Sequence, residues 1–205
     1  MPGGGSEGVD YKRLVIAVSG PPGSGKSTIA RRMASDLGLR YLSTGSIFRS
    51  IAAERGVSVV ELSRMAEEDP SIDLSVDRRM IEEAGRGGIV IDSHLAAWLI
   101  HDRATLLVYT KAPLIVRARR VAERDGVSVE DALEEITTRE YSQWRRFKRY
   151  YGVDVRDLGI FDIIIDTSRY GREEAYMLAL KALELKTGVG QVFIRGPGKQ
   201  RRVEG

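Results

Sequence analysis

Short apolar runs alternate along this chain with segments in which apolar residues recur every three or four positions. The runs predict buried parallel strands at Leu14–Val18, Arg40–Leu42, Gly88–Ile91, Thr105–Tyr109 and Asp162–Ile165. The other segments predict helices that begin near Lys26, Ser46, Val59, Leu74, Pro113, Val129 and Arg172. Because strands that alternate with helices assemble into a parallel sheet covered on both faces, the pattern predicts an α/β fold with a five-stranded parallel sheet.

Residues that favour helix ends stand where these helices should begin and stop. Ser58 and Ser128 are expected N-caps, because a serine hydroxyl accepts a hydrogen bond from the first turn of a helix. Gly126, Gly152 and Gly188 are expected to end helices, because glycine readily takes the left-handed conformation of a C-terminal cap.

The turn after the first predicted strand carries the pattern G-x-x-x-x-G-K-[ST], the phosphate-binding loop (P-loop). Its residues are Gly20, Pro21, Pro22, Gly23, Ser24, Gly25, Lys26, Ser27 and Thr28. The glycines let backbone N–H groups surround an anion, and the following helix N-terminus adds a partial positive charge. We expect Lys26 to reach the β- and γ-phosphates of a nucleotide and Ser27 to hold Mg²⁺. The alternative, a glycine-rich turn without a ligand, is disfavoured by the Lys-Ser pair and by both flanking elements.

The third predicted strand is followed directly by Asp92. Ligands of parallel sheets bind at the carboxyl ends of the strands, so this carboxylate is expected to face the crevice and to order Mg²⁺. The structural alternative is an aspartate that only caps the next turn. His94, two residues further on, is equally compatible with a site residue and with a structural residue.

A candidate anion site opens the helix after the second predicted strand. Thr44, Gly45 and Ser46 offer hydroxyl and N–H groups there, and Arg49 follows one turn later. The planar guanidinium of an arginine suits bidentate contact with a phosphate. Taken alone, however, an exposed arginine on an ordinary capped helix would be the simpler explanation.

Basic residues crowd the helix predicted from about Val129 to Tyr151. Between Arg139 and Arg149 there are five basic residues and one acid. Such a density of like charge is unfavourable unless an anion lies among the residues. Together with the phosphate-binding loop, it predicts a lid over about 128–152 that brings Arg139 and Arg146 to a transferring phosphoryl group. The alternatives are a solvated basic face and a patch for RNA.

Composition narrows the class of protein further. The chain has 205 residues, a net charge of +3 and no cysteine, which excludes disulfides, thiolate metal sites and a cysteine nucleophile. No apolar run approaches the length of a membrane span, and the N-terminal residues do not resemble a secretory signal, so we expect a cytoplasmic protein. The absence of Asn and the excess of Arg over Lys fit a hot environment, or a bias in nucleotide composition.

The net charge is concentrated in the C-terminal tail. Residues 187–205 hold four basic residues and one acid, which is the whole excess, so the rest of the chain offers no general surface for nucleic acid. We therefore expect a flexible leader at 1–10, a single domain at 11–186, and a basic, glycine-rich tail at 187–205.

Together these motifs resemble the nucleoside monophosphate kinases and, among them, the archaeal cytidylate kinases. The likeness runs from about residue 14 to residue 185. It is carried by the segments Ser19–Thr28, Ser43–Arg49, Ala66–Pro70, Ile72-Asp73, Arg139-Glu140 and Phe161–Ser168.

The resemblance implies a fold like that of the P-loop NTP hydrolases, with nucleoside-monophosphate-binding and lid helices. It implies phosphorylation of CMP and dCMP by ATP with Mg²⁺, in a chain that we expect to be a monomer. Gly20–Thr28, Arg117 and Arg120 would bind ATP. Thr44, Gly45, Arg49 and His94 would lie at the acceptor, and Lys26, Asp92, Arg139 and Arg146 at the reacting groups.

Some residues depart from the family pattern and leave alternatives open. Asp92-Ser93-His94 stands where bacterial cytidylate kinases have Asp-Gly-Arg, and Gln143 stands where they have an acid that reads the base. An adenylate kinase is disfavoured, since the Gly-Phe-Pro-Arg pattern and a zinc lid are both absent from the sequence. A UMP kinase or a shikimate-type kinase would share the loop. A nucleotide-regulated protein that binds RNA through the tail is the alternative from a different class.

Overall fold

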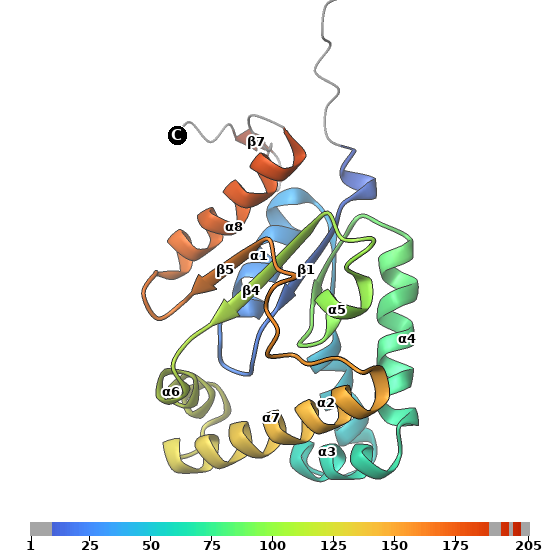
Figure 1. The fold of residues 1–205 in the computed structure, drawn as a ribbon. Helices are drawn as coiled ribbons and strands as arrows, with labels where there is room; N and C mark the ends of the chain where they lie inside the picture. Colours follow the sequence, from blue (N-terminus) through green and yellow to red (C-terminus); the bar gives the residue numbers. More distant parts are fainter. Residues whose placement is uncertain (1–9, 189–193, 197–198, 202–205) are drawn as a thin grey trace, which may run out of the picture.

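A five-stranded parallel sheet forms the centre of the molecule. The structure, a computed structural model, describes residues 10–188, 194–196 and 199–201 (Figure 1). The strand order is β2-β3-β1-β4-β5, and every neighbouring pair is parallel. The strands are β1 (Val15–Ser19), β2 (Arg40–Ser43), β3 (Ile89–Asp92), β4 (Leu106–Lys111) and β5 (Ile163–Asp166). The predicted fold class is therefore confirmed, and each strand begins and ends within two residues of its predicted bounds.

Helices connect the strands and cover both faces of the sheet. They are α1 (Lys26–Leu37), α2 (Thr44–Glu54), α3 (Val59–Glu68), α4 (Ser71–Gly85), α5 (Ala96–Ile100), α6 (Leu114–Asp125), α7 (Val129–Tyr151) and α8 (Arg172–Thr187). A 3₁₀ turn, Tyr11–Arg13, precedes β1. Within the described residues, none of these helices combines the length and the apolar character that crossing a bilayer requires.

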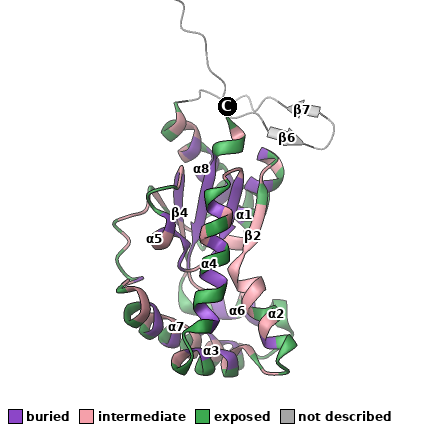
Figure 2. Cartoon of the chain, turned by 90° about the vertical axis from the view of Figure 1, so that its right-hand side faces the viewer, coloured by how far each residue is buried: buried purple, intermediate pink, exposed green. Residues whose placement is uncertain are grey.

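The core has two layers, one on each face of the sheet. Ile16 and Val18 of β1 pack in the layer formed with α1 and α8. Ala17 points to the opposite face, where α4 and α5 complete the second layer. This arrangement leaves the central strands buried, whereas β2 at the sheet edge is only partly covered (Figure 2). Alternate residues of one strand thus hold both layers together.

The predicted helix ends are confirmed. The Ser58 side chain accepts from the N–H of Glu61, whose carboxylate accepts in turn from the Ser58 N–H, so the two form a capping box. The Ser128 side chain caps α7 by accepting from the N–H of Asp131. Gly126 and Gly152 end α6 and α7 at φ 69°, in the left-handed conformation.

Two local features differ from the prediction. α4 begins at Ser71, three residues before the predicted Leu74, because the Asp69 carboxylate accepts a hydrogen bond from the Ser71 N–H at 2.9 Å. The five-residue helix α5 was not predicted, since it has no side-chain cap and is too short to show a helical period.

The ends of the chain are described only in part. The predicted leader lies outside the described residues except for Asp10, as does most of the predicted tail. Within the tail, β6 (Ile194–Gly196) and β7 (Lys199–Arg201) form an antiparallel pair.

The carboxyl ends of the strands point towards α6 and α7 (Figure 1). α7 packs against α6 through Ala132 and Ile136. It also reaches α3, where the Tyr150 hydroxyl donates to the Ala66 carbonyl at 2.8 Å. α7 thereby bridges the two sides of the space beyond the sheet, where ligands of parallel sheets bind.

The capping box of α3 yields a test of the fold. We expect Ser58→Ala to lower the free energy of unfolding by about 1 kcal/mol, because the N–H of Glu61 in the first turn loses its acceptor. Chemical denaturation measures this. Ser50→Ala, at an exposed serine within α2, is the matched control, since its side chain makes no hydrogen bond among the described residues. An equal loss of stability in the two variants would contradict the assignment.

Candidate active site

The phosphate-binding loop joins β1 to α1 and passes close to the backbone of its neighbours. Gly20 has φ 148°, and a Cβ there would lie 2.3 Å from the Thr110 carbonyl oxygen. Gly23 has φ 75°, and its Cβ would lie 2.6 Å from the Arg117 carbonyl oxygen. Both positions therefore require glycine, because a side chain would clash with backbone atoms that cannot move aside.

Hydrogen bonds of buried hydroxyl groups hold this loop in its conformation. The Ser24 and Thr110 side-chain oxygens lie 2.7 Å apart, and the Thr167 hydroxyl donates to the Ser24 carbonyl at 2.8 Å. The Ser24 side chain is fully buried and points into the protein. These contacts hold the loop in place before any ligand arrives.

A cavity of about 700 Å³ opens above the loop at the carboxyl ends of the strands. The P-loop, the start of α2, the end of β3, and one side each of α4, α6 and α7 contribute to its walls. All the predicted catalytic and acceptor residues line it, namely Lys26, Thr44, Gly45, Arg49, Asp92, His94, Arg139 and Arg146. The predicted ATP-binding residues that line it are Gly20, Pro22, Gly23, Gly25, Lys26, Ser27, Thr28 and Arg120.

Lys26 is the first residue of α1 and lies among other cations. Burial lowers the pKa of its ammonium group, the nearby Asp92 carboxylate opposes that shift, and Arg139, Arg124 and Arg49 lower the pKa further. Its Nζ donates to the Pro21 carbonyl at 3.4 Å. Four positive side chains thus converge on one cavity, which makes the cavity an anion site.

Asp92 ends β3, beside Val18 of β1 and Ser43 of β2. Its carboxylate is 2 % exposed and accepts from the Tyr41 hydroxyl at 2.8 Å. Among the described residues, no three His, Cys, Asp or Glu side chains gather to hold a metal ion by themselves. Ser27 and Asp92 line the same cavity and offer hard oxygen atoms, which fits a Mg²⁺ ion that takes most of its ligands from phosphates and water.

Arg49 lies on α2, one turn after the helix begins. Its Nη2 donates to the Ser46 hydroxyl at 3.1 Å. Burial lowers the pKa of its guanidinium, and Arg124 and Arg139 lower it further. The side chain is therefore oriented towards the cavity and lacks a carboxylate partner within ion-pair distance among the described residues, so it is ready for an anionic ligand.

The two lid arginines lie on the face of α7 that lines the cavity. Arg139 pairs with Glu135 on the same helix at 2.8 Å. Arg146 is 2 % exposed, pairs with Asp73 of α4 at 3.1 Å, and donates to the Ser63 carbonyl at 2.9 Å. Contacts to α3 and α4 thus hold Arg146, whereas Arg139 is held only within its own helix.

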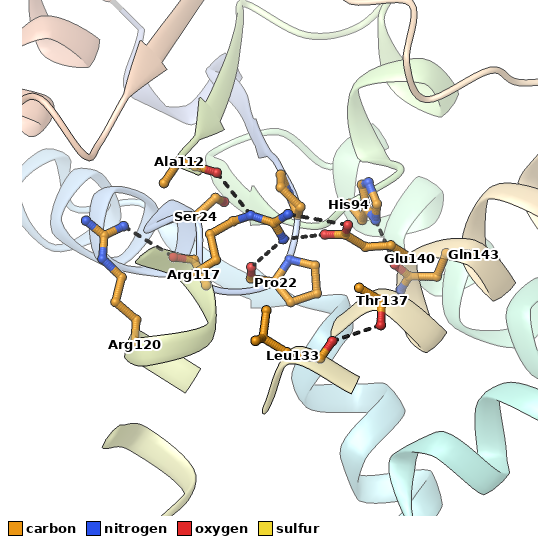
Figure 3. Close-up of polar contacts among 12 residues, drawn as sticks. Pro22, Ser24, His94, Ala112, Arg117, Arg120, Leu133, Thr137, Glu140 and Gln143 are labelled. Carbon is orange, nitrogen blue, oxygen red and sulfur yellow. Dashed lines mark hydrogen bonds and ion pairs between the residues drawn. The ribbon is translucent and has the colours of Figure 1, made fainter. Parts of the chain in front are cut away.

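The two arginines of α6 that were predicted to bind ATP have different surroundings (Figure 3). Arg117 donates to the carbonyls of Pro22 and Ala112 at 3.2 and 3.1 Å, and pairs with Glu140 of α7. Its guanidinium therefore ties the P-loop to the lid helix and does not line the cavity. Arg120 does line the cavity, and it donates to the carbonyl of Gly23 at 3.2 Å.

His94 connects the loop after β3 to α7 (Figure 3). Its Nδ1 lies 2.7 Å from the Gln143 side-chain oxygen, and its ring packs edge-on against Phe147. Burial lowers the pKa of His94 to about 4, so the ring is neutral at pH 7. A neutral ring at the cavity wall can hydrogen-bond a ligand but cannot neutralise a phosphate as an arginine would.

Several lining residues were not predicted from the sequence. Phe48, Arg124 and Arg172 line the cavity, as do Asp73 and Asp77 of α4. The two aspartates had a visible signal, because acids one turn apart interrupt the buried stripe of an otherwise amphipathic helix. Arg124 and Arg172 showed none, since an arginine on a helix is ordinarily exposed.

Several cytidylate kinases are similar to this chain in sequence. The cytidylate kinase of Aeropyrum pernix is 62 % identical over 164 residues, which cover 80 % of this chain and 95 % of that protein. The cytidylate kinase of Ignicoccus hospitalis is 54 % identical over 159 residues, covering 78 % and 92 %. That of Methanopyrus kandleri is 44 % identical over 180 residues, covering 83 % and 93 %.

Solved structures share the fold at low sequence identity. An uncharacterized protein from Eubacterium ventriosum has a TM-score of 0.61 at 16 % identity, over 83 % of this chain and 98 % of the other. Shikimate kinase from Acinetobacter baumannii, solved in complex with shikimate, has a TM-score of 0.53 at 20 % identity, over 88 % and 97 %. At such identities the likeness establishes the architecture alone.

The family model that matches the sequence spans residues 15–169, from the first residue of β1 to the turn after β5. This region contains the P-loop, the acceptor-side helix α2 and the lid helix α7, and so every element that carries a predicted site residue. On this match, and on the identity to the curated relatives, the chain belongs to the cytidylate kinase-like family.

Proposed function

We propose that this protein transfers the γ-phosphoryl group of ATP to CMP and dCMP. The observation that carries the proposal is that a P-loop, with Lys26, and an acceptor-side arginine, Arg49, face one cavity that two lid arginines also line. A single cavity with two anion-binding walls suits a reaction between two phosphate groups. The identity of the acceptor rests on the relatives, which are named cytidylate kinases.

In this proposal the P-loop and Lys26 bind the phosphates of ATP. The N–H groups at the start of α1 point at the anion, and the Lys26 ammonium meets the β- and γ-phosphates. Arg120 lines the cavity on the α6 side and borders the bound nucleotide. Arg117 contributes indirectly, because its contacts with Pro22 and Glu140 position the loop against the lid helix.

The acceptor nucleotide binds on the opposite wall. Arg49 holds its phosphate, with Thr44 and Gly45 at the start of α2 beside it. His94 lies at the junction of β3 and α7 and contacts the nucleotide as a neutral hydrogen-bonding group. These contacts bring an oxygen of the acceptor phosphate in line with the γ-phosphorus of ATP.

The reaction forms a bond from this oxygen to the γ-phosphorus and breaks the bond from the γ-phosphorus to the oxygen that bridges to the β-phosphorus. The products are ADP and CDP or dCDP. The attacking phosphate oxygen is already ionised, so no strong base is required and charge stabilisation supplies the catalysis. Arg139 and Arg146 of the lid helix serve this role, and they help to exclude water.

A magnesium ion belongs to this proposal as the partner of ATP. Ser27 and Asp92 would hold it, through the serine hydroxyl and the buried carboxylate at the end of β3. When bound, Mg²⁺ supplies further neutralisation of the phosphate charge.

A panel of acceptors tests the proposal directly. With Mg·ATP present, ADP formation should be stimulated strongly by CMP and dCMP, and weakly or not at all by UMP, AMP, GMP and shikimate. Stimulation by AMP alone would assign the protein to adenylate phosphorylation. Slow ATP turnover that no acceptor stimulates would contradict the kinase function altogether.

Removing the P-loop ammonium tests the donor site. We expect Lys26→Ala to lower kcat/KM by about 10³-fold or more, because the charge that stabilises the β- and γ-phosphates is lost. A coupled assay of ADP formation measures this, and circular dichroism verifies the fold. Lys12→Ala, at an exposed lysine, is the control and should retain normal activity. Near-normal turnover in folded Lys26→Ala would refute the assignment.

Removing the guanidinium of Arg49 tests whether this residue acts at the acceptor site or at the ATP site. We expect Arg49→Ala to raise the KM for CMP by about 10²-fold and to leave the KM for ATP nearly unchanged, because the lost contact is made to the acceptor phosphate. Arg55→Ala, at an exposed arginine directly after the same helix, is the matched control. Equal increases in both KM values would place Arg49 outside the acceptor site.

A further inference from the structure

Two carboxylates in the cavity wall have no role in the proposed phosphoryl transfer. Asp73 and Asp77 stand one turn apart on α4, are 6 % and 7 % exposed, and both line the cavity. Their neighbours Ile72, Val76 and Met80 are buried apolar residues of the same helix. Buried carboxylates are unfavourable in an apolar stripe, so their position calls for a partner.

Arg146 lies near both carboxylates but, within the part of the chain that the structure describes, pairs only with Asp73. The Nε of Arg146 lies 3.1 Å from Oδ2 of Asp73. Asp77 accepts a hydrogen bond from the Tyr151 hydroxyl at 2.6 Å, and none of the ion pairs found among the described residues includes it. Burial raises the pKa of Asp77 to about 6; the Tyr151 hydrogen bond opposes this, the charge of Asp73 adds to it, and Arg146 opposes it.

Hydrogen-bonding capacity remains beside the Asp73–Arg146 ion pair. Asp73 Oδ2 and Arg146 Nε are both buried, and neither makes a hydrogen bond of good geometry, although the two atoms lie within ion-pair distance. Arg146 is 2 % exposed. These two atoms partner each other, whereas Asp77 accepts only at Oδ2 and its Oδ1 makes no hydrogen bond among the described residues, so a carboxylate oxygen at the cavity wall is left for a ligand.

This acidic region has charged groups of its own and shares Arg146 with the proposed site of phosphoryl transfer. The charges that act on Lys26 are Asp92, Arg139, Arg124 and Arg49. The charged groups that act on Asp77 are Asp73 and Arg146, and these are absent from the first set. One cavity therefore has a cationic part suited to phosphates and a part with excess acid, suited to a hydrogen-bond donor.

Apolar side chains, two of them aromatic rings, line the cavity together with these acidic residues. The guanidinium carbon of Arg146 lies 5.7 Å from the centre of the Phe48 ring. Phe48, Leu95, Val76 and Phe147 all line the cavity. Aromatic and aliphatic walls with a polar edge suit a planar heterocycle, which buries its faces and hydrogen-bonds along its rim.

The polar edge matches the rim of cytosine. Cytosine presents an amino group, a donor, beside the ring nitrogen N3, an acceptor; a carboxylate beside a guanidinium is the complementary pair. Uracil presents a carbonyl oxygen and an N3–H at these positions, so its oxygen would face a carboxylate and its N–H would face a guanidinium. Resting on the proposed function, we propose that Asp77, beside the Asp73–Arg146 pair, accepts a hydrogen bond from the amino group of cytosine and selects CMP and dCMP over UMP.

Exchange of the carboxylate for an amide tests this selection. In Asp77→Asn the side-chain oxygen can still accept from Tyr151, while the new NH₂ group donates to the uracil carbonyl. At pH 8 we expect the ratio of kcat/KM for CMP to that for UMP to fall on the order of 10²-fold, with an unchanged KM for ATP. Glu82→Gln, at an exposed acid of the same helix, is the matched control and should keep the wild-type ratio.

The wild-type protein supplies a second measurement that needs no variant. Above pH 6 Asp77 is ionised and accepts a hydrogen bond; below pH 6 it is protonated and can donate to the uracil carbonyl. The neighbouring Asp73 also has a pKa raised by burial, which Arg146 opposes. The CMP-to-UMP ratio should therefore fall as the pH decreases from 8 to about 5.5, and effects on the acceptor phosphate cancel in the ratio.

The outcomes separate this inference from the proposed function. A wild-type protein that does not use CMP would overturn the proposed function and the inference with it. A wild-type protein that prefers CMP, with the same preference in folded Asp77→Asn, would overturn the inference alone. If Asp77→Asn fails to fold, a CMP-to-UMP ratio that stays constant from pH 8 to 5.5 in the wild type would overturn it.

Discussion

Mutual repulsion among the cations that line one cavity is the constraint on which the site depends. Lys26, Arg49, Arg124 and Arg139 act on one another across a single cavity, and the pKa of Lys26 and that of Arg49 are both lowered. Such a cluster is tolerable only where carboxylates and hydrogen-bond acceptors hold each side chain. The same repulsion leaves the cavity with a strong preference for an anion, which is what a phosphate ligand supplies.

Acids that pair with two further arginines connect the elements around the cavity. Glu140 of α7 pairs with Arg117 of α6, which in turn donates to the Pro22 carbonyl of the P-loop. Asp73 of α4 pairs with Arg146 of α7 on the other side. The lid helix is thus attached at both of its flanks through ion pairs, and a helix attached in this way can adjust when phosphates enter and compete for the arginines.

The fold alone does not determine which phosphoryl acceptor binds. Shikimate kinase has the same fold at 20 % identity and takes a substrate that is not a nucleotide. In the function proposed for this chain, the acceptor region consists of side chains of α2, α4 and α7 that meet only beyond the sheet, among them Arg49, Asp77 and Arg146. Variation on these three helices can change the acceptor while the P-loop and the sheet stay as they are.

The sequence by itself determined the secondary-structure elements, and it predicted the residues of the ATP side of the site. Strand bounds, the caps at Ser58 and Ser128, and the P-loop follow from contacts between residues near one another in the chain. Contacts between elements that are distant in the sequence could be identified only from the tertiary structure. Only the structure shows that Arg117 pairs with Glu140 and does not line the cavity. Only the structure shows that Asp77 lies in the cavity wall near Arg146. Helical period shows which face of a helix is buried, but the partner of a charged side chain depends on how the helices pack.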